Sequence, residues 1–441
     1  MKENKQSILS KDGVSYVVPF ILITSCFALW GFANDITNPM VKAFSKIFRM
    51  SATDGAMVQV AFYGGYFAMA FPAAMFIRKY SYKAGVLVGL GLYALGAFMF
   101  YPAKMTGEYY PFLAAYFLLT CGLSFLETSS NPYILSMGSE ETATRRLNLA
   151  QSFNPMGSLL GMYVAMNFIQ AKLNPLDTAS RAQLSADEFE AVKEYDLSVL
   201  IGPYLIIGLV ILVMFLVILF MKMPKSGDQN HQINFMPTLR RIFCMPHYRE
   251  GVIAQFFYVG VQIMCWTFII QYGTRVLMEE GMAEQQAEVM SQQYNIVAMC
   301  IFCFSRFICT FLLRYLNTGQ LLMILAVMGG ALTCGVIFFQ NIYGLYCLVG
   351  VSACMSLMFP TIYGIALRGL GDDAKFGAAG LIMAILGGSV LPPLQASIID
   401  MGTLFGMPAV NVSFALPFIC FVVIAIYGRR TYMRSKGLLK G

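Results

Sequence analysis

Apolar segments long enough to cross a membrane recur along this 441-residue chain, and they constrain the fold more than any other feature. A helix needs roughly 20 apolar residues to span a hydrocarbon core about 30 Å thick. With 58% hydrophobic and 12% charged residues, the composition also lies far from that of a soluble domain. The sequence predicts an all-α membrane protein with twelve transmembrane helices, at 16–38, 57–77, 84–102, 110–136, 147–169, 198–222, 250–271, 291–316, 320–340, 342–368, 376–400 and 404–428.

The distribution of positive charge predicts the topology. If both tails and the loops after even-numbered helices face inward, 21 of the 30 Lys and Arg residues lie inside and 8 lie outside. Lys and Arg accumulate in cytoplasmic segments, so both termini of this multi-pass protein are expected in the cytoplasm. The net charge of +7 then follows from topology, and no nucleic-acid partner is expected.

The longest predicted cytoplasmic loop divides the helices six and six. The expected organisation is an N-tail (1–15), an N-terminal six-helix bundle (16–222), a linker (223–249), a C-terminal six-helix bundle (250–428) and a C-tail (429–441). Trp30 and Trp266 occupy matching depths in helices 1 and 7, and Pro132 matches Pro360 in helices 4 and 10. Such duplication predicts two halves with a solute path between them near the midplane.

Three charged residues lie well inside the predicted helices, namely Asp35, Glu127 and Arg306. An acid at the bilayer centre costs at least about 2.5 to 3.5 kcal/mol, so such residues usually face a cavity and serve ions or substrate. Both histidines lie in the predicted linker, which leaves Asp35 and Glu127 as the candidate proton carriers. Arg306 fits a snorkelling or ion-paired structural role as well as a functional one.

Polar side chains that suit a polyhydroxylated ligand accompany the two acids. An amide both donates and accepts hydrogen bonds, although amides also join packed membrane helices. The candidate substrate contacts are Asn34, Asn38, Asn131, Gln151, Asn154, Gln262 and the aromatic Trp266.

Catalytic, metal and cofactor sites are not expected. Ten of the eleven cysteines fall inside apolar helices, where a free cysteine behaves as a small hydrophobic residue. The chain has no paired His and Cys ligands and no Gly-rich phosphate loop that follows a strand. An enzyme is therefore not expected. A passive channel or facilitator could share the architecture, but it would not need two buried acids.

Several stretches resemble the fucose:proton symporter family of the major facilitator superfamily, and together they cover nearly the whole chain. They are FALWGFAN (27–34), SYKAGVLVGLGLYALGA (81–97), LETSSNP (126–132), RLNLAQSFN (146–154), YVGVQIMCW (258–266) and FPTIYGIALRGLGDDAKFGAAGLIMAILGG (359–388). They are most similar to the L-fucose permease branch of that family.

This resemblance implies the major facilitator fold, two six-helix halves with pseudo-two-fold symmetry that open alternately outward and inward. It also implies that proton entry is coupled to sugar uptake. The expected protein is a bacterial inner-membrane symporter that takes up L-fucose with protons and works as a monomer. The alternatives are a symporter for glucose, galactose or another hexose, or a passive sugar facilitator.

The resemblance also assigns residues. The family's helix 4 acid matches Glu127, and its helix 5 amides match Gln151 and Asn154. Helix 1 differs, because the L-fucose permease branch has its acid where this chain has Asn38 and an Asn where this chain has Asp35. The exchange moves the carboxylate about 4.5 Å along the helix, at 1.5 Å per residue, and keeps it on about the same face.

Overall fold

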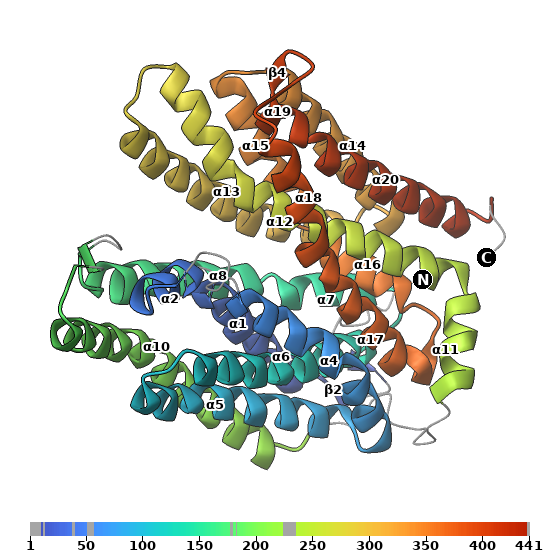
Figure 1. The fold of residues 1–441 in the computed structure, drawn as a ribbon. Helices are drawn as coiled ribbons and strands as arrows, with labels where there is room; N and C mark the ends of the chain where they lie inside the picture. The colour runs from blue at the N-terminus through green and yellow to red at the C-terminus, as the bar shows by residue number, and fades with distance from the viewer. Residues whose placement is uncertain are drawn as a thin grey trace. The chain divides into compact units, whose positions relative to one another are not determined.

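A computed structural model describes residues 10–11, 14–37, 40–50, 57–176, 180–181, 183–223 and 235–438. Asn38, one of the predicted substrate contacts, lies outside these ranges. The described chain is helical apart from four two-residue strands (Figure 1), which are β1 (Ser10–Lys11), β2 (Val14–Ser15), β3 (Thr403–Leu404) and β4 (Met407–Pro408). The last two form an antiparallel hairpin between α18 and α19.

The helices follow the predicted apolar segments, with short additional helices between them. Before the linker they are α1 (Val17–Thr37), α2 (Met40–Ile47), α4 (Met57–Lys79), α5 (Tyr82–Thr106), α6 (Tyr110–Ser136), α7 (Ala143–Gln151), α8 (Asn154–Val164), η1 (Ala165–Ile169), η2 (Gln170–Lys172) and α10 (Ala186–Phe220). After it they are α11 (Phe235–Cys244), α12 (Pro246–Glu279), α13 (Glu284–Leu312), α14 (Thr318–Phe338), α15 (Ile342–Met355), α16 (Met358–Ala366), η3 (Gly371–Asp373), α17 (Ala374–Met383), η4 (Ala384–Leu386), α18 (Gly387–Ile399), α19 (Ala409–Ser413) and α20 (Ala415–Ser435).

Within the described residues, eleven helical segments are long and apolar enough to cross a membrane. The remaining predicted helix, 147–169, is divided into α7, α8 and the π-helical turn η1. Its first interruption, at Ser152 and Phe153, comes shortly before Pro155. Proline has no N–H, and its ring clashes with the preceding turn, so it interrupts a helix a few residues upstream.

Side chains at the helix starts satisfy backbone N–H groups that the helix itself leaves unbonded. Ser81 caps α5 by accepting from the Ala84 N–H. Ser185 and Glu188 form a reciprocal capping box at the start of α10. At the starts of α14 and α15, the Asn317 and Asn341 side chains accept from the Gly319 and Tyr343 N–H groups. These caps place the ends of the helices at defined residues.

Residue contacts divide the chain into two compact units. One, called here the C-terminal unit, consists of Met1–Val14, Ile134–Ser152 and Asn234–Gly441, and the other, the N-terminal unit, consists of Ser15–Tyr133 and Phe153–Ile233. The C-terminal unit therefore contains the end of α6 and all of α7. The predicted division into bundles at 16–222 and 250–428 stays a prediction.

Helices α1 and α8 pack closely against each other in the N-terminal unit. A Cβ atom added at Gly157 would lie 1.8 Å from the Ala28 carbonyl oxygen, and one at Gly31 would lie 2.0 Å from the Asn154 carbonyl oxygen. Gly157 and Gly161 form the small-xxx-small spacing that lets membrane helices pack backbone to backbone. This contact fixes the start of α8 against α1.

Helix α12 is the central element of the C-terminal unit. It packs against α13, α15, α16, α18 and α20, while α14 packs along α20. The Tyr272 hydroxyl of α12 donates to the Val336 and Phe339 carbonyl oxygens at the end of α14. Asn411 of α19 also donates to the Val336 carbonyl. Two buried side chains thus satisfy carbonyl groups that the end of α14 would leave unbonded.

Candidate substrate and proton sites

Glu127 lies inside the N-terminal unit, on α6, nine residues before this helix ends at Ser136. Only 3% of its surface is exposed. The Tyr66 hydroxyl of α4 interacts electrostatically with the Glu127 carboxyl group, although the two do not form a hydrogen bond of standard geometry. Among the described residues, the Glu127 Oε2 atom has no hydrogen-bond partner. Glu127 is therefore a deeply buried acid with one oxygen available to a ligand or a proton.

The residues next to Glu127 have the same character. The hydroxyl groups of Thr128 and Ser130 are buried, and neither donates to a partner among the described residues. Asn131, one helical turn beyond Glu127, is fully buried as well. Buried polar atoms nearly always have a hydrogen-bond partner, so the unbonded oxygens of Glu127, Thr128 and Ser130 are candidates to bind a polar ligand or water.

Asp35 occupies a different environment near the end of α1. Both Asp35 and the adjacent Asn34 are half-buried. Tyr63 of α4 interacts electrostatically with the Asp35 carboxylate. Asp35 is thus more accessible than Glu127.

Helix α4 brings a tyrosine to each of the two acids. Tyr63 and Tyr66 are three residues apart, so they lie on the same face about one turn from each other. The ring of Phe62 contacts both of them. Neither tyrosine was among the candidate residues of the sequence analysis. The spacing of the two tyrosines was the available signal.

Asn154 is held by the contact between α1 and α8. Its Nδ2 donates to the Phe27 carbonyl oxygen over 3.1 Å, and Ser158 one turn later donates to the Gly31 carbonyl. Trp30, which stacks on Phe27 at 5.4 Å, lies on the same stretch of α1. The Asn154 amide therefore has a structural partner in addition to its predicted role.

Gln262 and Trp266 of α12 lie in the C-terminal unit, and both are half-buried. The Trp266 indole N–H donates to the Ser352 hydroxyl of α15 over 3.2 Å. The Trp266 ring also meets Phe302 of α13 edge to face, with the ring centres 4.9 Å apart. These two contacts fix the orientation of Trp266. The sequence analysis did not identify Ser352. Its only distinguishing feature in the sequence is that it is a polar residue in an apolar helix, which does not predict a contact with Trp266.

Gln151 also belongs to the C-terminal unit, at the end of α7, where it is 5% exposed. Its backbone carbonyl accepts a hydrogen bond of 2.8 Å from Arg306 of α13. Arg306 is 3% exposed, and all of its hydrogen bonds found among the described residues go to carbonyl groups. Arg306 therefore does not snorkel to a membrane surface.

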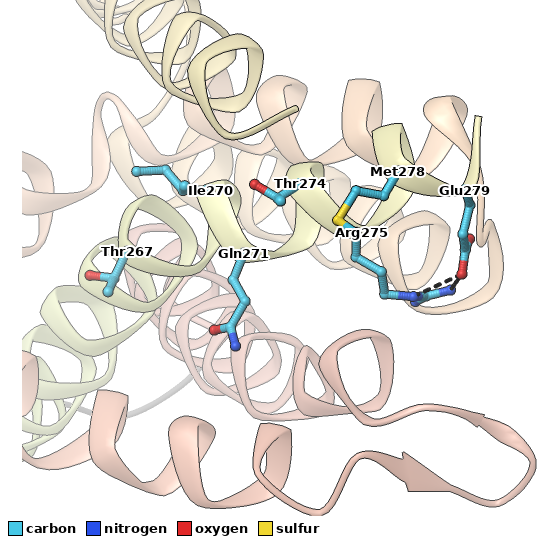
Figure 2. Close-up of a pocket in the computed structure, with 7 residues that line it drawn as sticks. All are labelled: Thr267, Ile270, Gln271, Thr274, Arg275, Met278 and Glu279. Carbon is cyan, nitrogen blue, oxygen red and sulfur yellow. Dashed lines mark hydrogen bonds and ion pairs between the residues drawn. The ribbon is translucent and has the colours of Figure 1, made fainter. Parts of the chain in front are cut away.

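A pocket of about 710 Å³ lies along the last turns of α12, beyond Trp266 (Figure 2). Its lining consists of Thr267, Ile270, Gln271, Thr274, Arg275, Met278 and Glu279. Arg275 pairs with Glu279 over 2.6 Å, so the charges at this end of the pocket compensate each other. All seven lining residues belong to α12, and the pocket is open to its surroundings.

The chain matches known transporters over most of its length. Residues 23–393 match the model of the Major Facilitator Superfamily. The chain is 52% identical to the L-fucose-proton symporter of Haemophilus influenzae, over 95% of this chain and 97% of that protein. It is 34% identical to the L-fucose-proton symporter of Escherichia coli, over 94% of this chain and 93% of that protein. A glucose/galactose transporter of Brucella abortus is 28% identical, with 92% of each chain covered.

Solved structures support the same relationship. The crystal structure of the major facilitator transporter FucP in its outward conformation matches with a TM-score of 0.85 and 32% identity, over 94% of this chain and 99% of that chain. A proton:xylose symporter, XylE, shares the fold with a TM-score of 0.64 at 10% identity, over 95% of each chain. The predicted all-α membrane architecture with the major facilitator fold is confirmed. The chain belongs to the major facilitator superfamily and, within it, to the family of the L-fucose-proton symporters.

Proposed function

We propose that this protein is a proton-coupled sugar symporter that takes up L-fucose by alternating access. The observation that carries the proposal is Glu127, a buried carboxyl group in the middle of a membrane-spanning helix with an oxygen that lacks a hydrogen-bond partner among the described residues. Two relatives that are 52% and 34% identical are named L-fucose-proton symporters, which supports L-fucose as the sugar.

In the proposed cycle, Asp35 takes up a proton and Glu127 responds to the arrival of the sugar. Burying an ionised carboxylate without a partner in a closed, water-poor cavity costs much free energy. Burying a neutral carboxyl group costs far less. Protonation therefore permits the conformational change that carries the sugar across. Each proton that moves inward with the sugar releases about 2.3 kcal/mol per 100 mV of membrane potential.

The proposed sugar contacts are the polar groups predicted from the sequence, namely Asn34, Asn38, Asn131, Gln151, Asn154, Gln262 and Trp266. The hydrogen bond from the Trp266 N–H to Ser352 holds the indole ring in one orientation. A ring held in this way can pack on the C–H face of a sugar. The amides would bind the hydroxyl groups, since each amide can donate and accept.

The protein is proposed to lie in a bacterial inner membrane with both termini in the cytoplasm and to work as a monomer. The excess of Lys and Arg in the loops assigned to the inside supports this orientation. A second candidate substrate is glucose or galactose, because the 28% identical relative is named a glucose/galactose transporter. The exchange of acid and amide between Asp35 and Asn38 makes that alternative worth a direct test.

Proton uptake into proteoliposomes tests the proposal. The purified protein is reconstituted, and external pH is recorded after addition of L-fucose, galactose, glucose or mannose. We expect L-fucose to make the medium more alkaline, and Glu127→Gln to abolish both this signal and accumulation against a gradient. Glu108→Gln, at an exposed acid just before α6, is the control and is expected to leave both unchanged.

Each alternative gives a different outcome. A larger alkaline signal with galactose or glucose than with L-fucose would reassign the substrate. Sugar exchange without any proton signal would leave a passive facilitator. Normal accumulation by Glu127→Gln would remove this residue from the coupling mechanism.

A further inference from the structure

Arg306 is a buried charged residue for which the transport cycle described above has no role. Within the C-terminal unit, its Nη1 donates to the Gln151 carbonyl oxygen over 2.8 Å, and its Nε donates to the Ser356 carbonyl oxygen over 2.5 Å. Its guanidinium also lies over the ring of Phe302, 4.6 Å from the ring centre. One side chain of α13 thus contacts both the end of α7 and the residue after the end of α15.

The two acceptors share an uncommon property. In an α-helix, the carbonyl of residue i accepts from the N–H of residue i+4. Residue i+4 is Pro155 for Gln151 and Pro360 for Ser356, and proline has no N–H to donate. Arg306 therefore donates to the two carbonyl groups that prolines leave without a helical donor, at the interruptions between α7 and α8 and between α15 and α16.

The same side chain reaches two of the proposed sugar contacts. It bonds directly to the backbone of Gln151, and Phe302 lies between it and Trp266. A planar guanidinium with several N–H groups in a fixed fork can serve two acceptors at once, whereas a lysine ammonium is a point charge on a flexible stem.

Two further contacts join α7 to α16 within the C-terminal unit. Asn148 donates to the Thr361 hydroxyl over 3.1 Å, and a Cβ atom added at Gly364 would lie 2.7 Å from the Thr144 Oγ1 atom. Arg306 is the charged member of this contact, and it is the one that reaches the interrupted ends of both helices.

We propose that Arg306 is a positioning residue that clamps two proline-interrupted helices together through the Gln151 and Ser356 carbonyl groups, and so fixes Gln151 and Trp266 for sugar binding. The clamp follows from the geometry alone, while its effect on sugar affinity rests on the proposed function. Arg306 itself need not touch the sugar.

A double-mutant cycle between Arg306 and Pro360 tests the clamp. Pro360→Ala supplies a backbone N–H that can bond the Ser356 carbonyl, so Arg306 should become less important in that background. The measured quantities are the thermal unfolding midpoint of the purified protein and the KM and kcat of L-fucose counterflow. We expect Arg306→Met to raise KM at least 10-fold with a smaller change in kcat, and to lower the midpoint.

Three further results are expected. Arg306→Met in the Pro360→Ala background should raise KM by at most one third of the factor seen in the wild-type background. Arg306→Lys, which can reach one carbonyl group, should give an intermediate KM. Arg314→Met, the same substitution at an exposed position just beyond α13, should change neither quantity.

The proposal is overturned if the effects of the Arg306 and Pro360 substitutions multiply independently in KM and add independently in the unfolding midpoint. If Arg306→Met does not fold, the cycle is run with Arg306→Lys. Independent effects of the Arg306→Lys and Pro360→Ala substitutions would then overturn the proposal in the same way. The midpoint needs no sugar, so a protein that binds no sugar at all would refute the proposed function and leave the test of the clamp intact.

Discussion

At the residue scale, the two intramembrane acids share one chemistry and differ in their surroundings. Glu127 is buried beside Tyr66, whereas Asp35 is half-buried beside Tyr63. A more accessible carboxylate exchanges protons with water readily, and a buried one responds to events inside the protein. This difference underlies the proposed division of roles between the two acids.

Replacing Asp35 by Asn should separate proton coupling from sugar binding. We expect Asp35→Asn to lose accumulation of L-fucose driven by a proton gradient, because the first proton acceptor is gone. Counterflow should be at least partly retained, since exchange of bound sugar does not require release of the proton. Both are measured with labelled sugar in proteoliposomes. Loss of counterflow together with accumulation would instead place Asp35 in the sugar site.

Moving the acid along helix 1 provides a sharper test. The double variant Asp35→Asn with Asn38→Asp restores the arrangement of the L-fucose permease branch, with the carboxylate about 4.5 Å further along the helix. We expect this variant to recover accumulation that Asp35→Asn alone has lost. Accumulation that stays absent in the double variant would show that the surroundings of Asp35 are specific to this chain.

A second pair of charges, Arg181 and Asp196, is completely buried in the N-terminal unit, at a distance of 2.6 Å. Asp196 also accepts from the Asn174 N–H. Removing one partner leaves the other charge buried without compensation, so Asp196→Asn should lower the free energy of unfolding by about 3 to 5 kcal/mol. Glu190→Gln, which breaks a solvent-accessible pair with Lys193, should cost less than about 1 kcal/mol. Chemical denaturation in detergent measures both, and equal effects would contradict this account.

At the scale of elements, glycine and proline decide how the helices meet. Prolines interrupt the helical segments between α7 and α8 and between α15 and α16. Gly157 has no side chain, so the backbones of α8 and α1 can pack in direct contact. A side chain at Gly157 would push the two helices apart. The predicted substrate contacts Asn154 and Gln151 lie directly beside one of these interruptions.

The α1–α8 contact makes a testable prediction. Gly157→Ala would place a methyl group 1.8 Å from the Ala28 carbonyl oxygen, so the helices must separate. Overpacking of this kind costs typically about 1 to 3 kcal/mol. A Cβ atom at Gly202 of α10 meets nothing within 4 Å, so Gly202→Ala should be neutral or stabilise by up to about 1 kcal/mol. Thermal unfolding should rank the two variants in this order, and the reverse ranking would contradict the close contact.

At the scale of the whole molecule, the distribution of Lys and Arg predicts the orientation. Fluorescent protein fused after Gly441 should fluoresce, because it folds in the cytoplasm. Alkaline phosphatase inserted after Leu184 should be active, because it requires the outer side. Activity of alkaline phosphatase fused at the C-terminus would reverse the predicted topology.

Much of the architecture was predictable from the sequence because its signals are local. A run of apolar residues long enough to span hydrocarbon is visible without any knowledge of neighbouring helices. The cost of an intramembrane acid likewise singles out Glu127 and Asp35 from their own positions in the chain. Stretches such as LETSSNP and RLNLAQSFN, which resemble those of the symporter family, then indicated the family.

The partners of the buried polar groups were not predictable in this way. Arg306 bonds to carbonyl groups 50 and 155 residues away, and Trp266 bonds to Ser352, 86 residues away. Nothing in the pattern around Arg306 distinguishes a clamp from a snorkelling side chain. By itself, the sequence determined the membrane class, the twelve apolar segments and the two intramembrane acids, because each follows from residues that are neighbours along the chain. Only the tertiary structure decided where the interrupted helices meet and which groups satisfy their carbonyls, because those contacts join residues that the sequence keeps far apart.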